Sequence, residues 1–305
     1  MRNFINAALL GVAYAAVDYS ESGANWEGLC ATGKEQSPID LIDQQMENKL
    51  AIKMEDYKNY GEDSGLKIKE KQDETLLMEF PSPADQGTMV LTFGDGTKNK
   101  YNPYAATVHA PSEHAVVGNI YDMELQLWHE AADGSGEIAV LAFLFSAEDD
   151  EESPFVADML RKIPSSGGVG IDKLDLADLL DKYILGHYFS YDGSMTTPPC
   201  TEGIKWTVIE APIPISKAQK KIFDDYYKND DDFADGNGNN RALQPINDRV
   251  LIENWAGECP EGEDDHCFGG DHSHGHGHGH DHDHDGASML GAAGAALLAI
   301  AAMQI

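Results

Sequence analysis

The chain has 305 residues and a formal net charge of −32, because 53 Asp and Glu face only 21 Lys and Arg. A charge this negative repels phosphate backbones, which argues against nucleic acid as a partner. Hydrophobic residues make up 42% of the chain and aromatic residues 9%, which is enough for a packed core and argues against global disorder. The length allows one large domain or two small ones.

Residues 1–16 have the layout of a secretory signal peptide. Arg2 precedes an apolar stretch from Ile5 to Ala13, and small residues follow at Ala15 and Ala16. A buried N-terminal helix is the alternative interpretation. We expect secretion, which places the mature chain outside the cytosol.

Residues 289–305 form an uncharged, Ala- and Leu-rich end that resembles the signal for a GPI anchor, in which lipid replaces the apolar tail. Attachment near Ser273 leaves a polar spacer of the usual length, whereas attachment at Ser288 leaves almost none. A retained tail anchor is the alternative, although this segment is short for crossing a bilayer. Together the two ends predict a protein held by its C-terminus on the extracellular face of the plasma membrane.

The remaining chain divides into a body, residues 17–252, and an acidic, His-rich tail, residues 253–288. In the tail, His alternates with Ser, Gly or Asp at seven positions: His272, His274, His276, His278, His280, His282 and His284. Imidazoles at this density bind zinc, copper or nickel, with a preference for copper. A polar spacer without a metal role is the alternative.

The chain has four cysteines, an even number that suggests disulfides in a secreted protein. A bridge between Cys30 and Cys200 would close a long loop around most of the body. A bridge between Cys259 and Cys267 would close a small loop in the tail.

Short apolar runs separated by turn residues indicate a β-rich body. The clearest predicted strands are residues 76–80, 89–93, 123–128, 138–145 and 205–209. Leucines at three- and four-residue steps predict a helix over residues 172–183, and a second helix is expected over residues 216–228. Residues 235–239 hint at a calcium loop, but the acidic ligand that should end such a loop is missing, so we do not expect calcium to bind there.

Six blocks of the sequence resemble the α-carbonic anhydrase family. In chain order they are Tyr19-Ser20 with Trp26, residues 33–40 (GKEQSPID), residues 109–114 (HAPSEH), residues 123–129 (MELQLWH), residues 193–203 (GSMTTPPCTEG) with Trp206, and residues 240–247 (NRALQPIN). The resemblance covers residues 17–252. It implies a mixed α+β, β-dominated fold with a central ten-stranded, mostly antiparallel twisted sheet and peripheral helices, and it implies a Cys30–Cys200 disulfide.

The family hydrates CO2 to bicarbonate with a hydroxide bound to zinc, and three neutral imidazoles hold the metal. Two ligands come from a His-x-His pair on one strand and the third from the neighbouring strand. The resemblance assigns these positions to Thr107, His109 and Gln126, so one imidazole remains. A single imidazole with a hydroxyl and an amide oxygen is a poor zinc site.

The other imidazoles of the body match no ligand position of the family. His114 and His129 match structural residues, and His187 has no counterpart among the ligands. His129 lies three residues after Gln126, so the alternation of a strand turns the two side chains to opposite faces. We therefore expect no substitute ligand among them.

The surrounding positions of the family's site are better preserved. Thr196 and Glu113 match the pair that orients the hydroxide, and we expect this pair to be vestigial. Glu124 and Gln36 match residues that support the ligands, and Glu74 matches the proton-shuttle position loosely. The apolar pocket is expected to be lined by Val140, Trp128, Met195, Thr197, Ile204 and Trp206, with the Trp128 indole filling much of the space for CO2.

The resemblance and the replaced ligands predict an extracellular, carbonic-anhydrase-like surface protein that is not catalytic and whose pocket or acidic face binds an unidentified partner. Two alternatives stay open. In one, the chain is an active or weakly active zinc carbonic anhydrase in which Gln126, Thr107 or a tail His joins His109 on the metal. In the other, the His-rich tail captures divalent metal outside the cell.

Overall fold

The computed structural model describes residues 17–42, 50–61, 64–70, 75–82, 85–160, 169–170, 173–184, 186–228 and 238–255. All of them belong to one compact unit. Its elements in chain order are α1 (Leu29–Thr32), β1 (Asp40–Leu41), β2 (Leu50–Glu55), β3 (Lys67–Glu70), β4 (Leu76–Glu79), β5 (Thr88–Phe93), β6 (Lys98–His109), β7 (Ala115–Val116), β8 (Asn119–Ile120), β9 (Met123–Ala131), β10 (Ile138–Ser146), α2 (Pro154–Leu160), β11 (Val169–Gly170), α3 (Leu176–Tyr183), β12 (His187–Ser194), β13 (Glu202–Pro214), α4 (Lys217–Lys228) and β14 (Ile252–Trp255).

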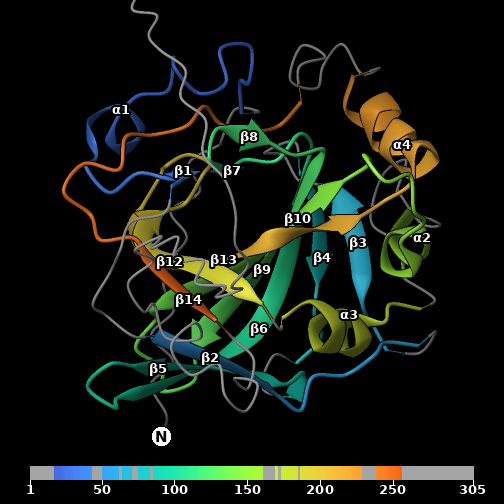
Figure 1. The fold of residues 1–305 in the computed structure, drawn as a ribbon, viewed down its shortest axis with the longest axis horizontal. Coiled ribbons are helices and arrows are strands. Elements are labelled where there is room, and N and C mark those ends of the chain that lie inside the picture. The colour runs from blue at the N-terminus through green and yellow to red at the C-terminus, as the bar shows by residue number, and fades with distance from the viewer. Residues whose placement is uncertain are drawn as a thin grey trace, which may run out of the picture. The chain divides into compact units, whose positions relative to one another are not determined.

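A large sheet runs through the molecule in the order β11-β3-β4-β6-β9-β10-β13-β12-β14, with β5 paired to β6 and β2 paired to β5 (Figure 1). Strands β10 and β13 are parallel, and the other described pairs of this sheet are antiparallel. The predicted β-dominated fold with a mostly antiparallel sheet is confirmed. The two-residue β11 brings the described strands of this sheet to eleven.

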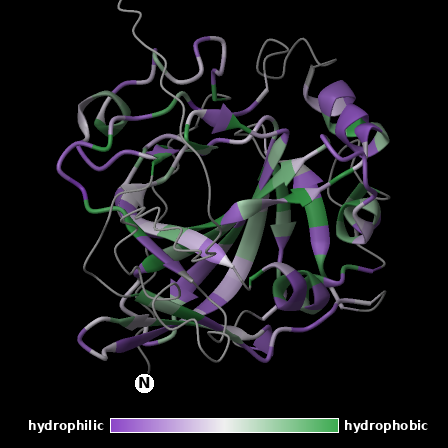
Figure 2. Ribbon diagram, viewed as in Figure 1, coloured by the Kyte–Doolittle hydropathy of each residue, from purple (hydrophilic) through white to green (hydrophobic). Residues whose placement is uncertain are grey.

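The two faces of the sheet bury separate hydrophobic clusters. Alternate residues of β9 show the division, because Met123, Leu125 and Leu127 join the larger cluster and Trp128 joins the smaller one. Strand β10 is buried on both faces and reads as an almost continuous hydrophobic run (Figure 2). The smaller cluster is the side on which the predicted site residues lie.

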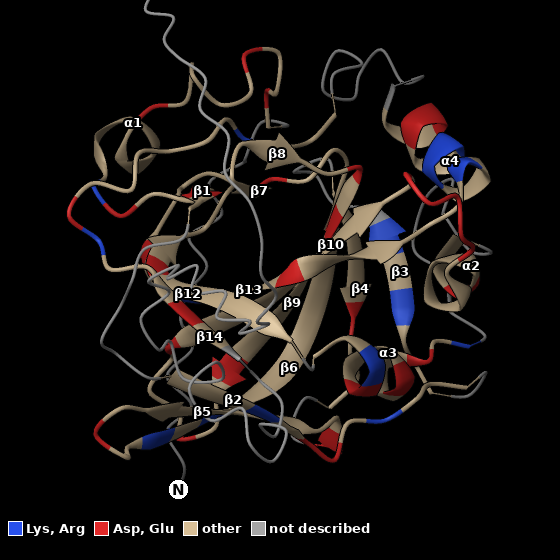
Figure 3. Ribbon diagram, viewed as in Figure 1, with Lys and Arg blue, Asp and Glu red and all other residues tan. Residues whose placement is uncertain are grey.

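Helices cover the face that carries the larger cluster. Phe155 of α2, Leu179 of α3 and Phe223 of α4 are all buried in that cluster, and the three helices gather at one side of the sheet (Figure 1). Charged residues lie mainly in loops, at strand ends and on the outer sides of α3 and α4 (Figure 3). No helix within the described ranges is long and apolar enough to cross a membrane.

The five predicted strands and two predicted helices are all present, with ends shifted by a few residues. Strand β14 extends past the expected end of the body at residue 252 to Trp255, which lies opposite His187 on β12. The change of composition that marks the tail begins only after this strand.

The disulfide between Cys30 and Cys200 is present, with a Cα–Cα distance of 5.1 Å. It joins α1 to the loop between β12 and β13. Several expectations fall outside the described residues: the signal peptide, the C-terminal anchor signal, the His-rich tract, the Cys259–Cys267 pair, Glu74 and the 235–237 part of the rejected calcium loop.

Candidate functional site

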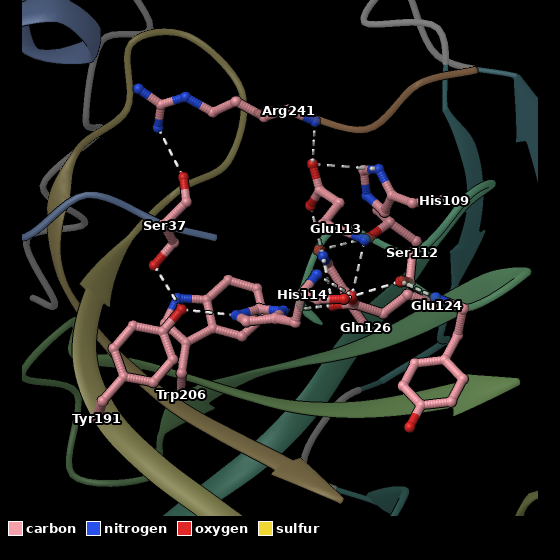
Figure 4. Close-up of polar contacts among 12 residues, drawn as sticks. Ser37, His109, Ser112, Glu113, His114, Glu124, Gln126, Tyr191, Trp206 and Arg241 are labelled. Atoms are coloured by element: carbon pink, nitrogen blue, oxygen red, sulfur yellow. Dashed lines mark hydrogen bonds and ion pairs between the residues drawn. The ribbon is translucent and has the colours of Figure 1, made fainter. Parts of the chain in front are cut away.

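Strands β6 and β9 place the three ligand positions of the family side by side. Thr107 lies directly opposite Gln126, and His109 lies opposite Glu124. Directly opposed residues of an antiparallel pair point to the same face, so all four side chains meet on the side of the smaller cluster. The strand register thus brings Thr107, His109 and Gln126 together. Figure 4 shows His109 and Gln126 in one group with Glu113 and Glu124.

The side chains at these positions form a continuous hydrogen-bonded chain. The Trp128 indole N–H donates to Thr107 Oγ1 over 2.9 Å, and the Thr107 hydroxyl donates to Gln126 Oε1 over 3.3 Å. Gln126 Nε2 then donates to two carboxylates, to Glu113 Oε2 over 2.6 Å and to Glu124 Oε1 over 3.0 Å. Carboxylate oxygens accept and do not donate, so they fix the orientation of the Gln126 amide.

Glu113 and Glu124 are both fully buried, and each is surrounded by donors. Glu124 Oε2 accepts the backbone N–H groups of Glu113 and His114 at 2.9 and 2.8 Å. Burial alone would raise the pKa of Glu124, but the contacts with His114 outweigh it and hold that pKa below its usual value. Glu113 Oε1 accepts the backbone N–H of Arg241 over 3.1 Å.

The buried His109 imidazole is oriented by the segment that precedes Arg241. Its Nδ1 lies 2.9 Å from the backbone oxygen of Asn239. A carbonyl oxygen only accepts, so Nδ1 carries the proton, and in the neutral ring Nε2 is the acceptor. Gly238 permits this close approach, because its φ is +96° and a Cβ there would lie 2.2 Å from the oxygen of Ala110.

A second arm of the network leads from Glu124 towards the N-terminal segment. His114 Nδ1 lies 2.9 Å from Glu124 Oε1, and its Nε2 lies 2.6 Å from the Tyr191 hydroxyl. Tyr191 continues to Ser37 Oγ over 2.8 Å. Burial raises the pKa of Tyr191 well above its usual value, so the phenol stays protonated and can donate to His114.

Arg241 connects the network around Glu113 to the N-terminal segment. Its guanidinium, almost wholly buried, donates to Gln36 Oε1 over 2.9 Å and to the backbone oxygens of Ser37 and Cys30, both over 2.7 Å. Gln36 also donates to the backbone oxygen of Cys200. Its described hydrogen bonds reach Arg241 and the disulfide loop, so Gln36 supports the site through Arg241 and not by contact with the ligand positions.

The predicted pocket residues line one apolar wall. Val140, Trp128, Ile204 and Trp206 are buried in the smaller cluster, and the partly buried Met195 packs against it. The Trp128 and Trp206 rings meet edge to face at 5.9 Å between centroids, so the Trp128 indole occupies this space. Thr197, in the loop between β12 and β13, is half-buried.

Thr196 is buried near this wall. Among the described contacts, however, no hydrogen bond joins it to Glu113. The two carboxylate oxygens of Glu113 accept instead from Gln126 and Arg241. The hydroxide-orienting role of Thr196 and Glu113 therefore stays a prediction carried by the resemblance.

The remaining imidazoles lie away from the ligand positions. His129 points to the opposite face of β9, where its Nε2 lies 2.6 Å from the Tyr57 hydroxyl, and burial lowers the pKa of His129 to about 3. His187 begins β12 and lies beside Glu253. The parity argument from the sequence agrees with the position of His129.

A cavity of about 970 Å³ is lined in part by Tyr191 and Trp206. Its lining includes Lys205, Arg249 and Ile252, but none of the three ligand positions. This cavity is therefore separate from the positions that bind zinc in the family.

Sequence reasoning missed four residues that organise the site: Ser37, Tyr191, Asn239 and Arg241. Ser37 and Arg241 lie inside blocks that carry the resemblance, so the resemblance could have identified them as site residues. Asn239 directly precedes such a block, and the sequence marks it only as the end of the rejected calcium loop. Its side chain accepts the Ala110 N–H over 3.0 Å and donates to Thr75 Oγ1 over 2.8 Å, contacts across more than a hundred residues that no local pattern reveals.

Comparisons with known proteins agree with the geometry. Residues 21–255 match the eukaryotic-type carbonic anhydrase family. A carbonic anhydrase of Neisseria gonorrhoeae is 31% identical over 245 residues, which cover 79% of this chain and 86% of that protein. Carbonic anhydrase Cah3 from Chlamydomonas reinhardtii, solved in complex with acetazolamide, superposes with a TM-score of 0.59 at 25% identity, covering 76% of this chain and 95% of that one.

A structure of dioscorin complexed with ascorbate superposes with a TM-score of 0.60 at 26% identity, covering 82% of this chain and 98% of that one. The family match spans well over half of the chain, and it contains every strand of the site. The chain therefore belongs to the eukaryotic-type carbonic anhydrase family.

Proposed function

We propose that this protein is a non-catalytic member of the carbonic anhydrase family that serves as an extracellular binding protein. One observation carries the proposal: the Gln126 amide stands between Glu113 and Glu124 and accepts from Thr107, where the family has imidazoles. The polar groups at the family's metal position thus satisfy one another. Binding of another small molecule by this fold has a parallel in dioscorin, whose structure is complexed with ascorbate.

The residues present do not fit the zinc ion of the family. Zinc there takes three imidazole nitrogens, whereas this site offers His109 Nε2 and two neutral oxygens. Both oxygens already accept hydrogen bonds, Thr107 Oγ1 from Trp128 and Gln126 Oε1 from Thr107. Zinc binding here would break these hydrogen bonds, and the hydroxyl and amide oxygens would be only weak ligands.

A CO2-hydration assay with a restored variant tests the proposal. Wild-type protein should hydrate CO2 no faster than buffer with the same zinc concentration. Thr107→His with Gln126→His should bind one more zinc per chain than wild type, a difference that cancels zinc bound by the tail. Adding Trp128→Val to this double variant should raise its CO2-hydration activity, because the smaller side chain opens the pocket. Wild-type hydration that acetazolamide inhibits would overturn the proposal and establish the active enzyme instead.

We propose further that the protein acts outside the cell and is held by a lipid anchor. The Cys30–Cys200 disulfide supports an oxidising compartment, and the two terminal segments have the composition of a signal peptide and a GPI signal. A phosphatidylinositol-specific phospholipase should release the protein from intact cells. Retention on the membrane after this treatment would contradict the anchor.

A further inference from the structure

Three neighbouring strands bring one imidazole and two carboxylates together away from the family's site. Strands β13, β12 and β14 lie in this order at the edge of the large sheet (Figure 1). His187 begins β12, Glu210 lies in β13 and Glu253 lies in β14. None of these residues takes part in the network around Gln126.

The strand register puts all three side chains on one face. Tyr188 lies opposite Ile209, so the next pair outward is His187 with Glu210. Phe189 lies opposite Glu253, and Phe189 is two residues from His187, so Glu253 shares the face of His187. The arrangement is therefore fixed by backbone pairing and not by the conformation of a loop.

The potential ligand atoms are close enough for one ion. One atom from each of His187, Glu210 and Glu253 lies within 4.8 Å of the other two. His187 Nδ1 lies 3.3 Å from Glu253 Oε1, a distance that suits two ligands of one metal with bonds of about 2.1 Å. The His187 and Glu253 side chains are 44% and 27% exposed, so an ion can enter from solvent.

The local charge also calls for a cation. Two carboxylates within 4.8 Å of each other repel, and a cation between them attracts both and so offsets that repulsion. Among the described residues, no ion pair joins Glu210 to a Lys or Arg. Burial raises the pKa of Tyr121, and the negative charge of Glu210 adds to this increase. One nitrogen and two carboxylate oxygens form a donor set that zinc accepts, with remaining positions for water or an external ligand.

We propose that His187, Glu210 and Glu253 form a zinc site at the β12–β13–β14 edge, separate from the family's buried site. Three ligands on rigid strands hold the ion, and its open positions face solvent. The body would thus bind metal at its sheet edge although the family's own ligands are replaced.

Zinc-dependent thermal stability of the full chain tests this site. A ligand stabilises the folded state only if it binds that state more tightly than the unfolded chain, so tail imidazoles that bind zinc in both states contribute little. Glu210→Gln and Glu253→Gln should each weaken the stabilising zinc site at least tenfold, because even groups that only orient a ligand change metal affinity by 10–100-fold. Glu130→Gln removes an exposed carboxylate from β9 and serves as the charge-matched control.

Side-chain NMR locates the ion. In long-range 1H–15N spectra, the His187 ring, assigned by its loss in His187→Gln, should show its Nδ1 signal shift on zinc addition in wild type and stay unshifted in Glu253→Gln. Equal zinc stabilisation of wild type, Glu210→Gln and Glu253→Gln would overturn the proposal, as would a His187 ring that zinc leaves unchanged. If zinc bound at His109 instead, it would stabilise wild type, Glu210→Gln and Glu253→Gln equally.

Discussion

The two faces of β9 bury polar side chains by opposite means. On the face towards the smaller cluster, Glu124 and Gln126 join a network that contains charged groups, and every one of these groups has partners. On the other face, His129 lies among hydrophobic residues with the Tyr57 hydroxyl beside it. Burial lowers the pKa of His129 to about 3, so this side chain is neutral.

The difference shows that a buried ionisable group can be accommodated by donors or by loss of its charge. Glu124 keeps its charge because the His114 imidazole and backbone and side-chain N–H groups surround it. His129 is accommodated by loss of its charge, because burial favours the neutral imidazole. Substitutions on the network face should therefore cost more than substitutions that remove one neutral group, and pH should act on the His129 face.

Arg241→Met should have the largest effect. It removes the buried guanidinium and leaves the backbone oxygens of Cys30 and Ser37 without their donor. Breaking a buried charged contact in this way costs about 3–5 kcal/mol of unfolding free energy, to be measured by urea denaturation. Arg249→Met, at a half-exposed guanidinium that also binds backbone oxygens, is the control and should cost clearly less. Equal costs would show that the network face is not special.

Gln126→Leu should come next. The substitution keeps the volume roughly constant but removes the one amide that donates to both Glu113 and Glu124. Loss of hydrogen bonds to charged groups costs about 1.5–3 kcal/mol, and the same denaturation experiment measures it. A cost below about 1 kcal/mol would mean that the remaining donors of the carboxylates suffice.

Acidification should destabilise the protein through His129. The folded-state pKa of about 3 lies below the ordinary histidine value of 6.5, so between these pH values the unfolded chain binds this proton and the folded protein does not. The stabilisation is complete above pH 6.5 and is lost as the pH falls towards 3. At pH 5 the loss from this group is about 2 kcal/mol.

Denaturation at pH 8, 6 and 5 measures this dependence. His129→Leu should flatten the decline between pH 6 and 5, whereas Tyr57→Phe keeps the buried imidazole and should keep the decline. A wild-type slope in His129→Leu would assign the acid sensitivity to other groups.

Thr107→Val should have the smallest effect. It removes a neutral hydroxyl that accepts from Trp128 and donates to Gln126 over a long 3.3 Å. The expected cost is about 1 kcal/mol, mostly from the buried indole N–H that loses its acceptor. Thr107→Ser keeps the hydroxyl and should lie closer to wild type. A cost above that of Gln126→Leu would reverse the proposed order within the network.

Much of this architecture is readable from the sequence. Alternation predicts the strands around Gln126, and parity alone separates it from His129. The hydrophobic pattern does not mark strand β6, because its first half, Lys98–Asn102, is mainly polar and its second half contains Pro103; only the resemblance places Thr107 and His109 on a strand. The replaced ligand positions follow from six sequence blocks, but the closed chain from Trp128 to the carboxylates depends on rotamers that packing selects.

Contacts between distant segments were beyond reach for a different reason. The partners of Arg241 lie 128 to 211 residues earlier in the chain, and no periodicity links such positions. The cluster of His187, Glu210 and Glu253 likewise needs the strand order, which places β14 beside β12. Sequence spacing gives no hint of that neighbour.

The late position of Arg241 also sets an order for biogenesis. Synthesis delivers Cys30, Ser37 and Glu113 long before the segment that contains Asn239 and Arg241. Until this segment leaves the ribosome, the backbone oxygens near the N-terminus and the Glu113 carboxylate lack donors that the finished protein supplies. These groups must remain hydrated during most of translation, so the buried centre of the protein is one of the last parts to be completed.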